Sequence, residues 1–329
     1  MVKYRVFVLR EGADPSEFME KTVNGTSSVK KVQLYGQTIV LSWPDSGQAM
    51  SHPAIEYQTT IDGEFILSSR EWKKDDTIVE IGGVEVGKGV TVAAGPCSID
   101  FSEGVEEFAV ALRKAGADII RGGAFKPRTS PFSFQGKGPE GIEILRRMGQ
   151  ASGLPIVSEI LDPDNIRNFQ GVDLLQIGSR NAQNFQLLRK VAADGRPILL
   201  KRGMGNTYTE WLASADYVLS EGNGSVILCE RGIRTFENAT RFTLDLGSIA
   251  RAKKESHLPV CADPSHAAGA RDLVMPLALS SVAAGSDMLL VEVHPNPEAA
   301  LSDGKQQITV KDLEKLTNSV KALQKAIRV

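Results

Sequence analysis

From residue 88 to the end of the chain, short apolar segments alternate with longer segments of helical periodicity, and this alternation restricts the fold more than any other feature. We predict eight strands, at residues 90–94, 118–121, 155–159, 174–177, 197–201, 225–229, 259–262 and 288–293. We predict helices at residues 102–115, 139–152, 182–193, 207–220, 238–254, 271–284 and 310–327. Strict alternation of strands and helices predicts an α/β fold with a parallel sheet.

The number of units distinguishes between the two common α/β architectures. Eight strand–helix units match a (β/α)8 TIM barrel, which typically has about 250 residues, whereas a doubly wound sheet rarely needs eight units of this regularity. A (β/α)8 barrel is therefore the predicted fold of this region. Because 42% of the residues are hydrophobic, a chain of 329 residues can bury a core of that size.

The first part of the sequence has a different pattern. It predicts a strand, a short helix, a hairpin and a strand pair, at residues 3–9, from 14 onward, at 29–43 and at 55–68. We therefore predict a small α+β domain at residues 1–73 and a catalytic barrel domain at residues 74–329. Residues 77–87 alternate around Gly82-Gly83, which predicts a β-hairpin at the floor of the barrel.

Charge and cysteine content restrict the possible partners. The chain has 38 Lys+Arg against 40 Asp+Glu and a net charge of −2, so there is no basic field that would indicate binding to nucleic acid or to a membrane. Any anion site must be local. The three cysteines are far apart and have no paired spacing, which favours a reducing compartment over a disulfide framework. We expect a cytoplasmic protein.

Charged residues gather where the predicted strands end, which in a (β/α)8 barrel is the face that carries the active site. The densest group is the segment from Arg121 to Pro131, which follows a short buried strand. The cations at the strand ends are Arg121, Lys126, Arg128, Arg180, Lys201 and Arg231. So many like charges in one place require anions, and the arginine fork suits phosphate and carboxylate groups. The sequence predicts at least one multiply anionic substrate.

A second group of residues at the same face has the chemistry of metal ligands. It consists of Cys97, His266, Glu292 and, beyond the eighth strand, Asp303. A thiolate, an imidazole and two carboxylates suit a divalent transition metal, whereas Mg²⁺ rarely takes sulfur. His294 lies two residues after Glu292, and spacing alone does not choose between it and His266.

The remaining cysteines and His257 fit structural positions. Cys229 and Cys261 end apolar runs, so we expect both to be buried as small hydrophobic side chains. His257 lies outside the predicted strands, and we expect it at the surface.

Several motifs at the strand ends resemble one known family. They are Gly95-Pro96-Cys97-Ser98, Lys126-Pro127-Arg128-Thr129-Ser130, Ile177-Gly178-Ser179-Arg180-Asn181, Leu200-Lys201-Arg202-Gly203, Asp263-Pro264-Ser265-His266 and Ser302-Asp303-Gly304. Together they resemble 3-deoxy-D-arabino-heptulosonate 7-phosphate (DAHP) synthase in its shorter subfamily, over about residues 75–329. Residues 1–70 are similar to the ferredoxin-like extension that some members carry.

The resemblance implies a metal-dependent, aldol-like condensation of phosphoenolpyruvate with erythrose 4-phosphate, the first step of the shikimate pathway. It implies that Cys97, His266, Glu292 and Asp303 hold Mn²⁺, Fe²⁺, Co²⁺ or Zn²⁺. It assigns phosphoenolpyruvate to Arg121, Lys126, Arg180, Lys201 and Arg231. Arg128 and Thr129 would bind the sugar phosphate, Asp263 would lie near the sugar hydroxyls, and Glu159 near a water molecule beside the metal.

Chemical reasoning adds a role for one of these residues. Lys126 lies among other cations, so we expect its pKa to be lowered and its ammonium group to give a proton to the new alkoxide.

Two other functions remain possible at this point. The related 3-deoxy-manno-octulosonate 8-phosphate synthase uses arabinose 5-phosphate, but it characteristically lacks a proline at the position of Pro127. A non-catalytic sugar-phosphate sensor on the same barrel would need neither the metal ligands nor the lysine beside them.

The resemblance also concerns regulation and assembly. The extension at residues 1–70 predicts feedback inhibition by an aromatic amino acid, with stabilisation of the oligomer as the alternative role. We expect a homotetramer.

Overall fold

The computed structural model describes residues 2–22, 28–45, 47, 49–128 and 130–327. A closed barrel of eight parallel strands confirms the predicted fold, and its strands follow one another around the barrel in chain order. The strands are β7 (Thr91–Gly95), β8 (Ile119–Arg121), β9 (Ile156–Glu159), β10 (Leu174–Ile177), β11 (Ile198–Lys201), β12 (Val226–Glu230), β13 (Val260–Ala262) and β14 (Met288–Glu292). β14 pairs with β7 and closes the ring.

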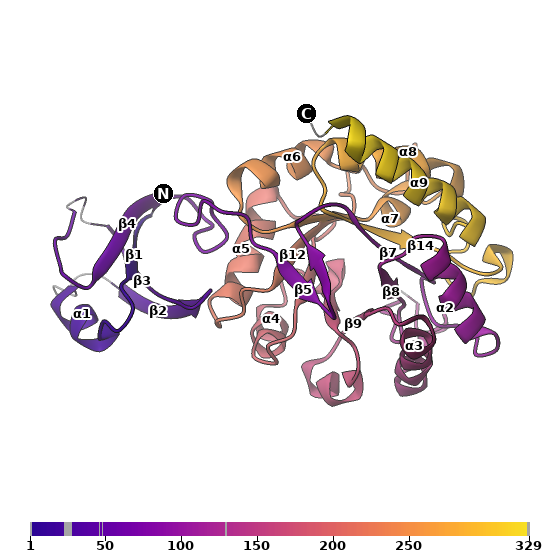
Figure 1. The fold of residues 1–329 in the computed structure, drawn as a ribbon, viewed down its shortest axis with the longest axis horizontal. Helices are drawn as coiled ribbons and strands as arrows, with labels where there is room; N and C mark the ends of the chain where they lie inside the picture. The colour runs from indigo at the N-terminus through magenta and orange to yellow at the C-terminus, as the bar shows by residue number, and fades with distance from the viewer. Residues whose placement is uncertain (1, 23–27, 46, 48, 129, 328–329) are drawn as a thin grey trace.

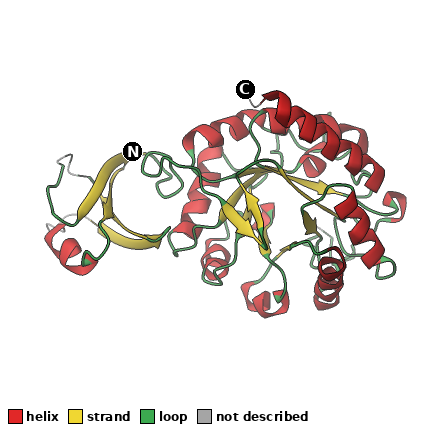
Figure 2. Cartoon of the chain, viewed as in Figure 1, coloured by secondary structure: helices red, strands yellow, loops and turns green. Residues whose placement is uncertain are grey.

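Helices surround the strands, as Figures 1 and 2 show. Their bounds are α2 (Val105–Lys114), α3 (Pro139–Ser152), α4 (Phe185–Ala192), α5 (Tyr208–Leu219), α6 (Leu246–Glu255), α7 (Pro264–Ala268), α8 (Arg271–Ala283) and α9 (Val310–Ile327). Three short 3₁₀ turns lie at η1 (Pro163–Phe169), η2 (Ser179–Asn181) and η3 (Pro297–Ala299). Local signals set several boundaries: Pro139 occupies the first turn of α3, and Thr207 with Glu210 forms a capping box at α5.

Two predictions of local structure were wrong, and one short helix was missed. Residues 238–245 are not helical, and α6 begins only at Leu246. The short helix α7 was not predicted, because five residues are too few to show helical periodicity. The strand pair at 55–68 is the single strand β4 (Ile55–Asp62), and the residues after it bond to the barrel instead of to a partner strand.

The small α+β unit lies beside the barrel (Figure 1). It consists of β1 (Lys3–Leu9), α1 (Pro15–Thr22), β2 (Ser28–Leu34), β3 (Gln37–Trp43) and β4. Its antiparallel sheet has the order β2-β3-β1-β4. Phe18 of α1 packs edge-on against Phe7 of β1, with ring centroids 5.2 Å apart, and helps to bury one face of the sheet.

The floor of the barrel is closed by the predicted hairpin, which consists of β5 (Val79–Ile81) and β6 (Val84–Val86). Gly82 and Gly83 turn it with φ of 53° and 88°, the left-handed backbone that a two-residue hairpin turn requires. Val79, Ile81 and Val86 are buried in one cluster with the inward-facing side chains of the strands. The barrel is therefore sealed by apolar packing at its N-terminal end.

The segment between β4 and the hairpin is bound to the outside of the barrel, and we call residues 66–77 the clasp. Asp216 of α5 accepts hydrogen bonds from the backbone N–H groups of Ile66, Leu67 and Ser68. His257 contacts the Leu67 carbonyl at 2.8 Å through Nε2 and the Thr77 hydroxyl at 2.8 Å through Nδ1. The prediction that His257 lies at the surface was wrong, because the clasp covers it completely.

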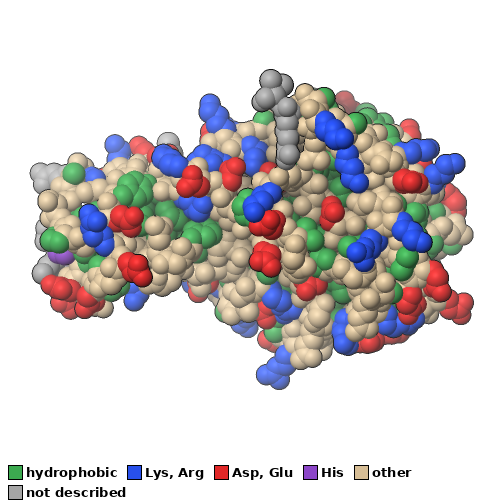
Figure 3. All heavy atoms as spheres, viewed as in Figure 1, with side chains coloured by type: hydrophobic (Ala, Val, Ile, Leu, Met, Phe, Trp, Pro, Cys, Tyr) green, Lys and Arg blue, Asp and Glu red, His purple; other side chains and the backbone are tan. Residues whose placement is uncertain are grey.

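A second contact joins the small sheet directly to the barrel. The Tyr35 hydroxyl, at the β2–β3 turn, donates a hydrogen bond to the Gly224 carbonyl just before β12. Figure 3 shows acidic and basic side chains interspersed over both parts on the face in view, with no single-sign patch. Among the described residues, no helix combines the length and apolarity needed to cross a membrane.

Candidate active site

A cavity of about 260 Å³ lies at the C-terminal ends of the strands, opposite the sealed floor. Most of the residues predicted from the strand ends line it: Lys126, Arg128, Glu159, Arg180, Lys201, Arg231, His266 and Asp303. The structure thus brings together five of the predicted cations from the ends of four strands, β8, β10, β11 and β12. A pocket with this charge is suited to a ligand that carries several negative groups.

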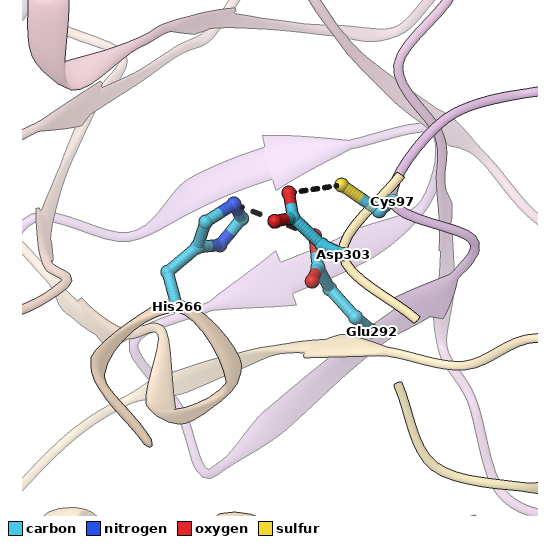
Figure 4. Close-up of side chains that lie close together, drawn as sticks. All are labelled: Cys97, His266, Glu292 and Asp303. Carbon is cyan, nitrogen blue, oxygen red and sulfur yellow. Dashed lines mark hydrogen bonds and ion pairs between the residues drawn. The ribbon is translucent and has the colours of Figure 1, made fainter. Parts of the chain in front are cut away.

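The four predicted metal ligands form one group beside this cavity. One donor atom from each of Cys97, His266, Glu292 and Asp303 lies within 4.8 Å of the others, and Figure 4 shows the side chains converging. The Cys97 thiol donates to Asp303 Oδ2 at 3.1 Å, and His266 Nε2 lies 3.4 Å from Glu292 Oε1. This soft and hard donor set fits a divalent transition metal. Of the two histidines that spacing left open, His266 lies in this group, whereas His294 Nε2 contacts Asp100 Oδ1 at 3.0 Å.

Local backbone structure places two of these donors. Cys97 follows β7 at a point of close approach, where a side chain at Gly95 would collide with the carbonyl oxygen of Arg121. His266 lies on α7, which begins with Pro264 and is capped by the Asp263 carboxylate, an acceptor for the His266 backbone N–H.

Lys126 lies at the junction of the cations and the donor group. Its Nζ donates to Cys97 Sγ at 3.1 Å and to the Cys97 carbonyl at 3.2 Å. Burial lowers the pKa of Lys126, but the Cys97 sulfur that accepts its hydrogen bond and the carboxylates of Glu292 and Glu159 outweigh burial and raise the pKa above the ordinary value. The expected lowering of this pKa was wrong. Sequence order showed the neighbouring cations but not the acidic side chains that the fold adds.

Burial and neighbouring charges also decide the pKa values in the donor group. Burial, reinforced by Glu292, raises the pKa of the Cys97 thiol to about 12, so the free thiol is protonated. Asp303 differs, because His266 and Arg241 outweigh the effect of burial and lower the pKa of its carboxyl. The buried carboxylate of Glu292 and the half-buried carboxylate of Asp303, beside a thiol, therefore form a site of negative charge that a cation would stabilise.

Three predicted substrate contacts need separate description. Arg121 is buried and is not among the residues that line the cavity; it donates to Glu292 Oε1 at 2.8 Å, while its Nε has no partner among the described residues. Asp263 is fully buried, and its Oδ2 lies 2.6 Å from Lys201 Nζ and 2.7 Å from His266 Nδ1. Its role beside the sugar hydroxyls stays a prediction. Thr129 lies outside the described residues.

Several residues at this face were not predicted from the sequence. Arg241 and Phe242 line the cavity, and the Arg231 guanidinium stacks on the Phe242 ring at 4.1 Å. Gln306 donates to Glu292 Oε2, and Gln307 accepts from the Cys97 backbone N–H at 3.0 Å. Arg241 and Phe242 lie in the segment mistaken for helix. The glutamines lie after the last strand, where only the adjacent Ser302-Asp303-Gly304 motif could have drawn attention to them.

Cations for phosphate or carboxylate groups and donors for a divalent metal meet in one cavity, and this pairing defines a class of barrel enzymes that act on phosphorylated substrates beside a metal. The chain belongs to the DAHP synthetase I family, which it matches over residues 67–329. The family is metal-dependent, and the resemblance noted in the sequence is confirmed. The chain is thus an enzyme of DAHP synthesis.

Similar proteins agree in sequence and in structure. The chain is 48% identical over 265 residues to phospho-2-dehydro-3-deoxyheptonate aldolase of Thermotoga maritima. The matched region covers 80% of this chain and 78% of the relative. The crystal structure of the Thermotoga maritima enzyme, a DAHP synthase, matches with a TM-score of 0.79 at 39% identity over 98% of both chains. A 2-dehydro-3-deoxyphosphooctonate aldolase of Desulfatibacillum aliphaticivorans is only 31% identical, over 74% of this chain and 95% of the relative.

Proposed function

We propose that this cavity joins phosphoenolpyruvate, erythrose 4-phosphate and water to give DAHP and inorganic phosphate. The observation that carries the assignment of the site is the contact of Lys126 Nζ with Cys97 Sγ at 3.1 Å, because it links the anion-binding cations to the metal-donor group. In the reaction, C3 of the enol phosphate bonds to the aldehyde carbon. Water adds at C2, and the C2–O bond to phosphate then breaks.

Each substrate has a group of side chains suited to it. Arg180, Lys201 and Arg231 line the cavity and, together with the buried Arg121, would bind the phosphate and carboxylate of phosphoenolpyruvate. Arg128 is also a lining residue, and with Thr129 it would bind the sugar phosphate. Glu159 lines the same cavity and is the proposed partner of the attacking water.

Cys97, His266, Glu292 and Asp303 would hold one divalent ion, Mn²⁺, Fe²⁺, Co²⁺ or Zn²⁺. When bound, the ion supplies Lewis-acid stabilisation of the negative charge that develops on the aldehyde oxygen. Asp263 orients the imidazole of His266 through Nδ1, which leaves Nε2 facing the donor group.

Lys126 is the proposed proton donor to the new alkoxide. Its raised pKa keeps Nζ protonated at neutral pH, so the proton is present when the oxygen becomes basic. Because the same ammonium group is hydrogen-bonded to Cys97, it is held at the edge of the donor group.

The test is phosphate release from phosphoenolpyruvate with each aldose, measured with and without a chelator. We expect release with erythrose 4-phosphate, little with arabinose 5-phosphate, and none from metal-free enzyme. Preference for arabinose 5-phosphate would favour the octulosonate reaction, and absence of turnover with either sugar would favour a sensor.

We also propose that residues 1–73 form a regulatory domain and residues 74–329 the catalytic domain. None of the described residues of the small sheet lines the cavity, so the sheet is free for another role. A truncated form of the Thermotoga maritima enzyme, matching 80% of this chain at 45% identity with a TM-score of 0.75, has a solved structure. Removal of residues 1–62 leaves the clasp intact. This truncation should preserve turnover and abolish inhibition by tyrosine or phenylalanine.

Assembly and location complete the proposal. We propose a homotetramer, which light scattering of the full chain would test. The three cysteines are free, which agrees with the reducing cytoplasm as the proposed compartment.

A further inference from the structure

Arg241 is a cation of the active-site face that the proposed reaction does not use. It lies on the loop between β12 and α6, where the backbone N–H groups of Arg241 and Phe242 donate to the carbonyls of Ala268 and Ala267 at 3.3 and 3.0 Å. Ala267 follows His266 on α7. The loop that carries Arg241 is thus attached to the helix that carries one of the four metal donors.

The guanidinium group of Arg241 contacts the loop that carries another donor. Its Nη1 donates to Asp303 Oδ1 at 2.9 Å and to Gln306 Oε1 at 2.9 Å. Asp303 Oδ2 lies on the other side of the carboxylate and accepts from the Cys97 thiol at 3.1 Å. The two oxygens of Asp303 therefore have different neighbours: one faces the donor group, and the other is held by Arg241.

Glu292 is held in the same way. Its Oε2 accepts from Gln306 Nε2, while its Oε1 faces Arg121 at 2.8 Å and His266 at 3.4 Å. Arg241 and Gln306 thus form one hydrogen-bonded chain that binds the outer oxygen of each carboxylate in the donor group.

The backbone conformation of Asp303 is one that the surrounding contacts have to stabilise. Its φ of 50° lies in the left-handed region, which residues other than glycine seldom adopt. A residue in this conformation persists only where its surroundings hold it.

We propose that Arg241 is a positioning residue for the metal site: it holds Asp303 so that Oδ2 alone is presented to the divalent ion. The inference rests on the proposed metal site. Groups that hydrogen-bond to metal ligands fix their orientation, and their loss typically weakens metal affinity about 10- to 100-fold.

The competing role for Arg241 is direct contact with the sugar phosphate, because the residue lines the cavity and its side chain is 38% exposed. The contacts favour positioning, since Nη1 is already engaged by two acceptors that belong to the loop of Asp303.

The experiment is calorimetric titration of metal-free, full-length protein with Mn²⁺, together with the KM for erythrose 4-phosphate at saturating metal. We expect Arg241→Gln to weaken Mn²⁺ binding about 10- to 100-fold and to change this KM little. Arg241→Lys keeps the charge and should recover part of the affinity. Arg146→Gln is the matched control, because Arg146 also donates through Nη1 to a carboxylate, Glu143, and is 42% exposed.

Unchanged Mn²⁺ affinity in Arg241→Gln would overturn the proposal, and a raised KM for the sugar would then assign Arg241 to the substrate. If Arg241→Gln does not fold, Arg241→Met, which also lacks the donor, takes its place, and unchanged Mn²⁺ affinity in that variant overturns the proposal equally. Cys97→Ser tests the site itself. If Cys97→Ser loses Mn²⁺ binding but Arg241→Gln does not, the proposed metal site is supported and the role of Arg241 is refuted. If Cys97→Ser binds Mn²⁺ as the wild type does, the proposed metal site itself is refuted.

Discussion

Both ends of the barrel bury ionisable side chains, but the partners of these side chains differ. At the floor end, Asp216 accepts hydrogen bonds from three backbone N–H groups, and His257 contacts a backbone carbonyl and a hydroxyl group. At the other end, Glu292 and Asp303 face other ionisable groups, and the Cys97 thiol lies between Lys126 and Asp303.

This difference separates structural from functional burial. A buried carboxylate whose acceptors are filled by the backbone stabilises the fold and has no remaining capacity for a ligand. A buried group whose neighbours are themselves ionisable keeps its charge only through those neighbours, and a bound substrate or ion can replace them. A criterion based on burial alone would not distinguish the structural carboxylate of Asp216 from the functional carboxylate of Glu292.

The largest expected effect is at the functional end. Lys126→Met should reduce kcat by about 10²- to 10⁴-fold, because proton donation to the alkoxide is lost. Affinity for phosphoenolpyruvate, measured by calorimetry, should fall much less, since Arg180, Lys201 and Arg231 remain. Lys137→Met is the control, because Lys137 is on the same loop and pairs with Glu140. Equal losses of kcat and affinity in Lys126→Met would make Lys126 a binding residue only.

Asp216→Ala should reduce the stability of the fold and leave catalysis unchanged. The three backbone N–H groups of the clasp lose their acceptor, so the free energy of unfolding should fall by about 4 kcal/mol. Urea titration measures this loss, and kcat of the folded enzyme should stay unchanged. An equivalent change at Asp272, an exposed residue in the first turn of α8, should have little effect. A large fall in kcat would refute the division between the two ends.

His257 gives the floor end a pH dependence. Burial, helped by Lys73 and Arg70 against the Leu67 hydrogen bond and Asp76, lowers its pKa from 6.5 to about 4. The neutral imidazole therefore stabilises the fold above pH 6.5, and this contribution is lost as the pH falls towards 4. His257→Gln should be less stable than wild type at pH 7, and the gap should shrink by about 3 kcal/mol by pH 4. Urea titrations at both pH values decide it; a constant gap would contradict the prediction.

Tyr35→Phe should have the smallest effect. It removes one hydrogen bond, from the Tyr35 hydroxyl to the Gly224 carbonyl, and the free energy of unfolding should fall by about 1 kcal/mol. The ring still packs edge-on against His257, so the contact between sheet and barrel should persist. A loss of several kcal/mol in urea titration would mean that this bond, more than the clasp, holds the sheet.

Features that depend on local periodicity could be predicted from the sequence, and features that depend on distant partners could not. The eight strands and the hairpin at Gly82-Gly83 follow from apolar pattern and turn chemistry. The position of His266, and not of His294, beside the other three donors depends on α7, which is too short for its periodicity to be read. The clasp was missed because its hydrogen-bond acceptor, Asp216, lies 150 residues away from Ile66. Likewise, the direction of the Lys126 pKa depends on Glu159 and Glu292 from other strands.

The sealed floor has a kinetic consequence. Val79, Ile81 and Val86 block one end of the barrel, so substrates and products must share the entrance at the other end. Under the proposed roles, the cations for phosphoenolpyruvate lie nearer the barrel axis, while Arg128 lies on the loop at the rim. In a cavity with one entrance, the substrate that binds deeper has to enter before the substrate that binds nearer the entrance. Phosphoenolpyruvate should therefore bind first and the sugar second, an ordered sequence imposed by the hairpin at the far end of the molecule.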